Sequence, residues 1–223
     1  MSVVARPTAV AKTRVKSARP TRDAERTQAA ILDAATAEFA RHGLGGARVD
    51  RIALRANTNK RMLYYYFGGK EALFLAVLER AYEHIRNEEQ GLHLTDLEPV
   101  EGVRELIVFT WNYYLAHPEF MTLLNSENLH RAQHLKRSQK IRAMHSPLIE
   151  TLSEVLARGA REGVFRRGVD PVQLYVSIAA LGYFYLSNNH TLSTIFGRDL
   201  LATRAKAERL AHINDLVLGY LAK

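Results

Sequence analysis

The 223-residue sequence contains no cysteine, which excludes disulfides, zinc–thiolate sites and thiol catalysis and fits a reducing compartment. It also has no run of about 18 apolar residues, the length that a membrane-spanning helix needs. The start of the chain lacks the apolar stretch of a secretory signal. We therefore expect a cytoplasmic protein, and no motif in the sequence indicates a cofactor.

Acidic residues are scarce in the first third of the chain. Residues 1–70 hold 14 Lys and Arg against 5 Asp and Glu, a net charge of +9. Residues 71–223 hold 17 against 18, a net charge of −1. A basic module followed by a near-neutral one indicates a head that binds a polyanion, joined to a body with a different role.

The first 21 residues contain no acid, two prolines and no apolar periodicity. These features predict a disordered basic arm. A transit peptide is the alternative for such an Arg-rich, acid-poor start.

Helical periodicity dominates the rest of the chain, and no segment alternates as a strand would. The chain is therefore predicted to be all-α. Prolines mark several helix starts, and Asp170 is expected to cap the helix that begins at Pro171. The expected helices run from about residue 23 to the glycines of RHGLGG, over 49–56 and 60–67, from 70, over 99–117, from 118, from 147, and over 171–188 and 198–221.

Two short helices joined by a three-residue polar turn lie at the end of the basic module. Residues 49–56 and 60–67 form the helices, and Asn57-Thr58-Asn59 forms the turn. Asn57 can adopt a left-handed conformation at low cost, and Asn59 can cap the second helix. This pattern predicts a helix-turn-helix, whose second helix lies in the major groove of DNA.

The second of these helices, KRMLYYYF, has one face for the core and another for DNA. At about 100° per residue, Leu63 and Phe67 share a face, and Arg61 and Tyr65 point the opposite way. Arg61 suits guanine because its planar fork matches O6 and N7, while phenols and helix N-termini suit phosphates. The residues predicted to contact DNA are Arg48, Asn59, Lys60, Arg61, Met62, Tyr64, Tyr65, Tyr66 and Lys70.

Residues 26–75 resemble the N-terminal domain of TetR-family bacterial transcriptional regulators. The typical family run is Ala-Gly-Val-Ser, two small or polar residues, Leu-Tyr-Tyr, an aromatic or His, Phe, and then Ser-Lys-Glu-Ala-Leu. Here it reads ANTNKRMLYYYFGGKEALF. Asn57 replaces the usual glycine and Asn59 the usual serine, each keeping the physical role, whereas Arg61-Met62 replaces a small pair and changes which operator is read. Arg48 stands near a frequent Thr cap, so its side chain is expected to supply that phosphate contact.

The resemblance implies a division of labour along the chain. Residues 22–69 would form the DNA-binding domain, and residues 70–223 a helical domain for dimerisation and effector binding. The implied protein is a homodimer that binds a palindromic double-stranded operator, as a repressor released by a small-molecule effector.

The helix expected over residues 101–117 is apolar nearly all round, so it should lie centrally and line a pocket. Nothing in the sequence identifies the effector. The candidate effector-binding residues are Trp111, Tyr114, Asn125, Asn128, His130 and Tyr183.

Two other interpretations stay open. Glu127, His130 and His134 have the i, i+3, i+7 spacing of a metal site on one helical face, as in a metal-dependent helical hydrolase, although no fourth ligand or base motif follows. An architectural DNA-binding protein without a sensor is the other interpretation, and the long near-neutral body argues against it.

The last two helices are expected to form the dimer interface, because their apolar faces exceed what one small domain must bury. The residues assigned to these faces are Leu174, Ile178, Leu181 and Tyr185 in one helix and Leu210, Ile213, Val217 and Tyr220 in the other.

Overall fold

The computed structural model describes residues 22–223, apart from the side chains of residues 145 and 146. The basic arm predicted for residues 1–21 lies outside the described residues. Within them the fold is all-α, and the only β pairing is an isolated bridge between Phe165 and Ala222. The α-helices are α1 (Arg22–Gly46), α2 (Val49–Arg55), α3 (Lys60–Phe67), α4 (Lys70–Gln90), α5 (Pro99–Ala116), α6 (Pro118–Leu129), α7 (Gln139–Glu162), α8 (Pro171–Ser187), α9 (Asn189–Phe196) and α10 (Thr203–Leu221), with 3-10 turns η1 (Leu94–Asp96) and η2 (Leu135–Arg137).

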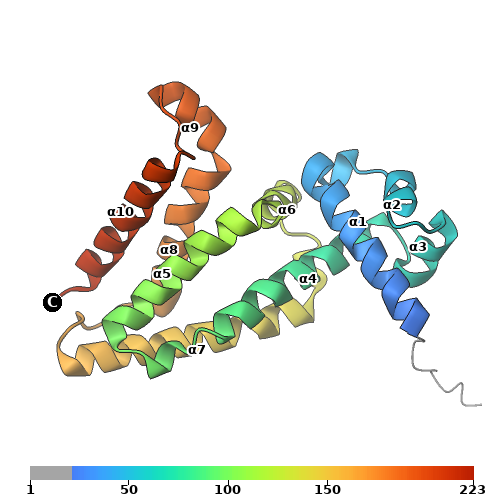
Figure 1. Ribbon diagram of the computed structural model, residues 1–223. Helices are drawn as coiled ribbons and strands as arrows, with labels where there is room; N and C mark the ends of the chain where they lie inside the picture. Colours follow the sequence, from blue (N-terminus) through green and yellow to red (C-terminus); the bar gives the residue numbers. More distant parts are fainter. Residues whose placement is uncertain (1–21) are drawn as a thin grey trace, which may run out of the picture.

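Helices α1 to α3 gather at one end of the molecule, and α4 leads from them into the body (Figure 1). A buried cluster joins these helices through residues such as Ile31, Phe39, Ile52 and Leu63. The first half of α4 also belongs to this cluster, and α6 adds Leu123. Helices α4 and α6 therefore both hold the N-terminal end against the body.

The body is built around α5, as its apolar sequence predicts. Helices α4, α7, α8 and α10 pack on it, so its Leu106, Ile107 and Trp111 are almost fully buried. Close packing in the body depends on a small residue at Gly159 of α7, where an added Cβ would overlap the Phe165 ring. No helix in residues 22–223 combines the length and the apolar character needed to cross a membrane.

Two helix starts predicted for the body are wrong, and one helix was not predicted. Pro147 does not begin a helix but lies inside α7, which starts at Gln139 with Ser138 as its cap. A proline inside a helix leaves one carbonyl unbonded, and this is tolerated here because Ala143 and Pro147 are exposed to water. Helix α9 was not predicted, and the last helix starts at Thr203 rather than near Arg198, because a short helix and a left-handed Gly197 separate it from α8.

The residues assigned to a dimer interface are also partly wrong. Leu174, Ile178, Ile213 and Val217 are buried within the chain's own core, because α8 and α10 turn these faces toward α5. The large apolar side chains that α8 and α10 leave exposed are Val172, Val176, Phe184, Leu216 and Tyr220, of which only Tyr220 was among the predicted residues.

Candidate nucleic-acid interface

The turn between α2 and α3 has the geometry that its asparagines predict. Asn57 adopts the left-handed conformation, with φ of 48°. Asn59 is the N-cap of α3, and its side-chain oxygen accepts a hydrogen bond of 3.0 Å from the Met62 N–H. This cap satisfies one of the free N–H groups at the start of α3, so the turn sets where α3 begins.

Helix α3 is anchored on one side and exposed on the other. Leu63 is completely buried, and this burial stabilises the helix by about 2–3 kcal/mol relative to an exposed leucine. Tyr66 and Phe67 pack against the same cluster. Arg61 and Tyr65 point away, with Tyr65 78% exposed, so α3 presents them as the sequence predicts.

Lys60 and Arg61 differ in what holds their side chains. The Lys60 ammonium lies 2.9 Å from the Asp50 carboxylate on α2. Their hydrogen bond and mutual attraction lower the pKa of Asp50 and raise the pKa of Lys60, so both groups stay charged. Arg61 makes no hydrogen bond or ion pair with any described residue, so its guanidinium is the one in this pair that is free to meet a ligand.

Lys70 stands at the first position of α4, where the backbone N–H groups of a helix attract anions. Gly68, between α3 and α4, has a φ of 77°, a conformation suited to glycine. The Lys70 ammonium donates a 3.2 Å hydrogen bond to the Gly45 carbonyl at the end of α1. This bond holds the ammonium at the junction of α1 and α4.

Glu38 of α1 organises the start of α2. This carboxylate is 6% exposed and accepts bonds from the Arg48 N–H at 2.9 Å and from Arg51 Nε at 2.7 Å. Burial alone raises the pKa of Glu38, but the bonds from Arg51 and Arg48 outweigh it and leave the pKa below its ordinary value. Arg48 precedes α2 with an exposed side chain that makes no capping bond, so it too can reach a phosphate.

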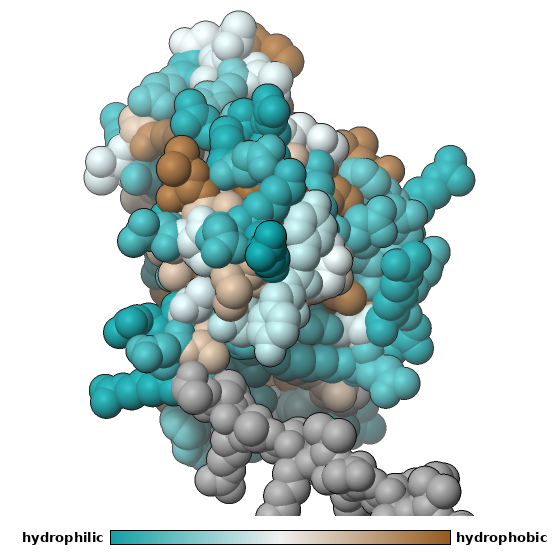
Figure 2. All heavy atoms as spheres, turned by 90° about the vertical axis from the view of Figure 1, so that its right-hand side faces the viewer, coloured by the Kyte–Doolittle hydropathy of each residue, from teal (hydrophilic) through white to brown (hydrophobic). Residues whose placement is uncertain are grey.

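The surface of this end is strongly hydrophilic. Figure 2 looks onto the side of the molecule that carries α1 to α3, and hydrophilic side chains cover most of it. The exposed arginines and lysines in or beside α1 to α3 are Arg22, Arg26, Arg41, Arg48, Arg51, Arg55, Lys60 and Arg61. A surface of this charge and geometry can bind the phosphates of duplex DNA while one helix enters a groove.

The six predicted effector residues do not form one cluster. Trp111 and Tyr114 are buried in the core of the body, where Tyr114 stacks on Phe120. Asn125 and Tyr183 hydrogen-bond to each other at the surface. Asn128 is exposed, and His130 bonds through Nδ1 to the Ser126 carbonyl at 2.7 Å.

The predicted helical metal face at residues 127–134 is wrong. Helix α6 ends at Leu129, because Arg131 and Ala132 both adopt left-handed conformations. The Glu127 carboxylate instead accepts bonds from the backbone N–H and ring Nδ1 of His134, at 2.9 Å and 2.6 Å. Both carboxylate oxygens therefore close the loop after α6.

A buried polar group in the body was not predicted from the sequence. Arg86 and Glu89 of α4 are 3% and 4% exposed, and Arg86 Nη1 lies 2.7 Å from Glu89 Oε2. Arg86 Nη2 also donates to the Tyr175 hydroxyl at 2.7 Å. The signal in the sequence was their place on the apolar stripe of α4, in line with Leu78 and Ile85.

A cavity of about 140 Å³ between α4, η1 and α7 borders this buried pair. Burial raises the pKa of Glu89 to about 7, with Arg86 acting in the opposite direction. Arg86 Nη1 and Glu89 Oε2 face each other in the ion pair, whereas Arg86 Nε and Glu89 Oε1 make no hydrogen bond to any described residue. Such atoms are normally satisfied, so this cavity is equipped to hold a small polar molecule.

Comparisons with known proteins agree with this geometry. Residues 31–77 match the model for bacterial regulatory proteins of the tetR family, and residues 99–217 match the tetracyclin repressor-like C-terminal domain. The chain is 42% identical over 200 residues to the HTH-type transcriptional repressor NicS of Pseudomonas putida, covering 90% of this chain and 94% of that protein.

Solved structures share the architecture. SCO4942 from Streptomyces coelicolor, assigned as a transcriptional regulator, aligns with a TM-score of 0.66 at 26% identity, over 87% of this chain and 98% of that chain. The regulator FadR from Bacillus subtilis, solved with stearoyl-CoA, has a TM-score of 0.63 at 15% identity, over 86% of this chain and 98% of that chain. The names of these proteins are those of transcriptional regulators rather than enzymes.

Proposed function

The chain belongs to the TetR family of bacterial regulatory proteins, and from this premise we propose a repressor that binds a palindromic operator as a homodimer and leaves it when a small molecule binds. The family is one of DNA-binding, ligand-responsive regulators, and the name of NicS supports repression. A regulator that acts on bacterial DNA works in the cytoplasm, so we propose that location. We propose residues 22–69 as the DNA-binding domain and residues 70–223 as the regulatory one.

The observation that carries the proposal is the free, exposed guanidinium of Arg61 in the first turn of α3. We propose that Arg61 reads a base, because a recognition helix meets base edges near its N-terminal end. Lys60 is less suited to that role, because its ammonium is already paired with the Asp50 carboxylate. Arg48, Lys70 and the exposed tyrosines of α3 are proposed to bind phosphates, with Asn59 and Met62 fixing the start of the helix.

Selection of bound sequences from random duplex DNA tests this function. The full chain should recover a site with two inverted halves whose centres lie about one helical turn apart or a multiple of it. Recovery of sequences with no shared motif would instead favour the architectural interpretation, since such a protein has little sequence preference.

The dimer is proposed to form through the outer faces of α8 and α10. These helices lie side by side and run in opposite directions (Figure 1). Exposed Val172, Val176 and Phe184 follow one another at multiples of four residues on α8, and Leu216 and Tyr220 do the same on α10. A second copy related by a two-fold axis would cover both stripes, which are otherwise an unusual apolar exposure for a monomer.

Light scattering after size-exclusion chromatography tests this surface. Val176→Asp and Leu216→Asp should each yield monomers that keep the helical circular dichroism spectrum. Leu129→Asp is the control, because Leu129 is an exposed leucine at the end of α6, outside α8 and α10. Dimers of unchanged stability in both interface variants would reject the surface.

The effector is proposed to bind in the cavity beside Arg86 and Glu89. Its size, about 140 Å³, approaches that of an engineered cavity of about 150 Å³ that accepts benzene, so it has room for about one small ring. The unsatisfied atoms of Arg86 and Glu89 favour a ligand that carries both an acceptor and a donor. A screen of small polar compounds for release of operator DNA tests this site. Thr151→Phe should abolish the response by filling the cavity, without weakening operator binding.

A further inference from the structure

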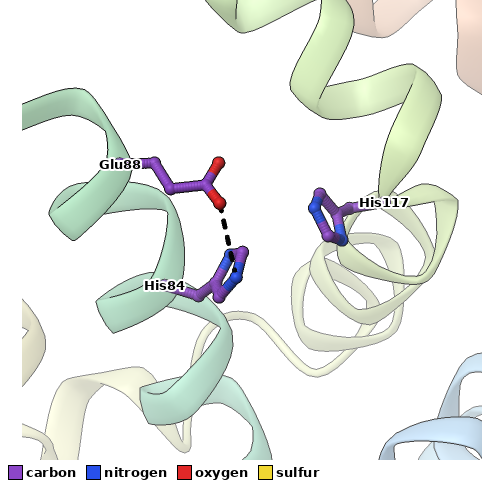
Figure 3. A group of neighbouring side chains, drawn as sticks. All are labelled: His84, Glu88 and His117. Atoms are coloured by element: carbon purple, nitrogen blue, oxygen red, sulfur yellow. Dashed lines mark ion pairs between the residues drawn. The ribbon is translucent and has the colours of Figure 1, made fainter. Parts of the chain in front are cut away.

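Three side chains that commonly bind metals meet where α4 faces the junction of α5 and α6. His84 and Glu88 lie one turn apart on α4, and His117 separates α5 from α6 (Figure 3). One ligand atom from each residue lies within 4.8 Å of the other two. We propose that these residues form a binding site for a divalent transition-metal ion such as Zn²⁺, which fastens α4 to the start of α6.

The spacing needs only side-chain movement to bind an ion. Tetrahedral zinc at about 2.0–2.1 Å from each ligand places the ligand atoms about 3.3–3.4 Å apart. His84 Nε2 and Glu88 Oε1 are already 3.5 Å apart. Both residues are exposed, so their rotamers can adjust, and the distance to His117, within 4.8 Å, has to shorten by at most about 1.4 Å.

The other nitrogen of each imidazole is already engaged. His84 Nδ1 lies 3.0 Å from the Tyr113 hydroxyl, and His117 Nδ1 lies 3.1 Å from Glu119 Oε1. The Tyr113 hydroxyl oxygen can accept a hydrogen bond from the imidazole N–H at Nδ1 of His84. Partners of this kind orient metal-binding histidines and leave Nε2 for the ion. Three protein ligands leave a fourth position for water or an anion.

The position of the site connects it to DNA binding. His84 and His117 line a cleft of about 320 Å³, which is also lined by Asp33 and Thr36 of α1. Helix α6 holds α1 through Leu123 in the shared core and through the Ser126 hydroxyl, which accepts a 3.1 Å bond from the Leu44 N–H. An ion that joins α4 to α6 therefore restrains the N-terminal end relative to the body. Regulation of DNA binding by this ion is a second step, which rests on the proposed function.

Metal binding is measured on the full chain without a histidine tag, after treatment with a chelator and without DNA. Isothermal titration with Zn²⁺ should give one ion per chain, and Co²⁺ should produce visible d–d absorption bands of a tetrahedral site. His84→Ala and His117→Ala should each lower the affinity at least about 100-fold, and Glu119→Gln about 10-fold, because loss of an outer partner costs about 10- to 100-fold. His212→Ala is the matched control, since His212 is exposed on α10 and outside the cluster.

Two results would overturn the site: no saturable binding of Zn²⁺ by the wild type, or equal affinity in the wild type and both histidine variants. The three residues would then be only surface ion pairs, which contribute little. Circular dichroism and urea unfolding without metal check that the variants are folded, and His84→Gln provides a second variant that keeps a polar side chain. Operator affinity is then compared with and without Zn²⁺. A change in the wild type that His117→Ala abolishes supports the regulatory step, and no change in the wild type refutes that step alone.

Discussion

Replacing Arg61 by alanine should remove sequence recognition while leaving the fold intact. The side chain is exposed and has no partner among the described residues. Alanine is also a slightly better helix former than arginine, so α3 should not unfold. Any loss of DNA affinity can then be attributed to the interaction with DNA itself.

The size of the loss follows from the geometry of the contact. A bidentate contact between arginine and guanine contributes about 1–3 kcal/mol of discrimination, and a two-fold dimer makes two such contacts. The variant should therefore bind the operator about 2–6 kcal/mol less tightly. This is a loss of roughly 30- to 20,000-fold in affinity, since about 1.4 kcal/mol is a factor of ten. Random DNA should lose much less, through one phosphate-attracting charge per subunit.

Lys70→Ala is the matched comparison, because it also removes one positive charge from the same end. The affinity that this variant loses should be similar for operator and random DNA, as expected for a phosphate contact at a helix N-terminus. This variant also loses the bond to the Gly45 carbonyl, so urea unfolding must accompany it. Fluorescence anisotropy with operator, single-base variants and random duplex at several salt concentrations provides the affinities. Equal losses on every duplex for Arg61→Ala would refute base reading by Arg61.

Three further predictions concern the cap, the buried carboxyl and the arm. Asn59→Ala should lower the free energy of unfolding by about 0.5–2 kcal/mol, while Asn59→Ser, which keeps a capping oxygen, should not; equal losses in urea would contradict the cap. Because burial raises the pKa of Glu89 to about 7, the folded state holds this proton more tightly than the unfolded state. Stability should therefore fall by about 1–3 kcal/mol as pH rises from about 5.5 to 8.5, and Glu89→Gln should lack this dependence in urea unfolding. Deleting residues 1–21 should weaken binding to all DNA alike. The slope of log K against log salt concentration should become less steep by about 0.9 for each phosphate that the arm neutralises. A changed preferred sequence would contradict this prediction.

The N-terminal end could be predicted almost residue by residue because local interactions determine it. The left-handed Asn57, the Asn59 cap and the opposite faces of Leu63 and Arg61 all depend on residues within one or two turns. The bounds of α3 match the prediction for the same reason.

The pairing of Lys60 with Asp50 was not predicted, although it separates the two basic residues of α3. It joins two helices, so it depends on the angle at which α2 meets α3. The Lys70 bond to Gly45 spans 25 residues and is likewise absent from any local pattern.

In the body, periodicity identified apolar faces but not what covers them. Ile213 and Val217 were assigned to an interface with a partner chain, whereas they pack on α5 of their own chain. The sequence pattern of an apolar stripe does not distinguish these two cases, because it is the same whether the stripe faces a helix of the same chain or a second copy.

The sequence by itself determined the all-α class, the helix-turn-helix and the basic end, because helical period, capping and charge are properties of neighbouring residues. Only the tertiary structure decided that Glu127 closes a loop, that Arg86 and Glu89 border a cavity, and that His84, Glu88 and His117 meet. These groupings bring together residues from separate helices or across a loop. Their distances follow from how the helices pack, which no local pattern specifies.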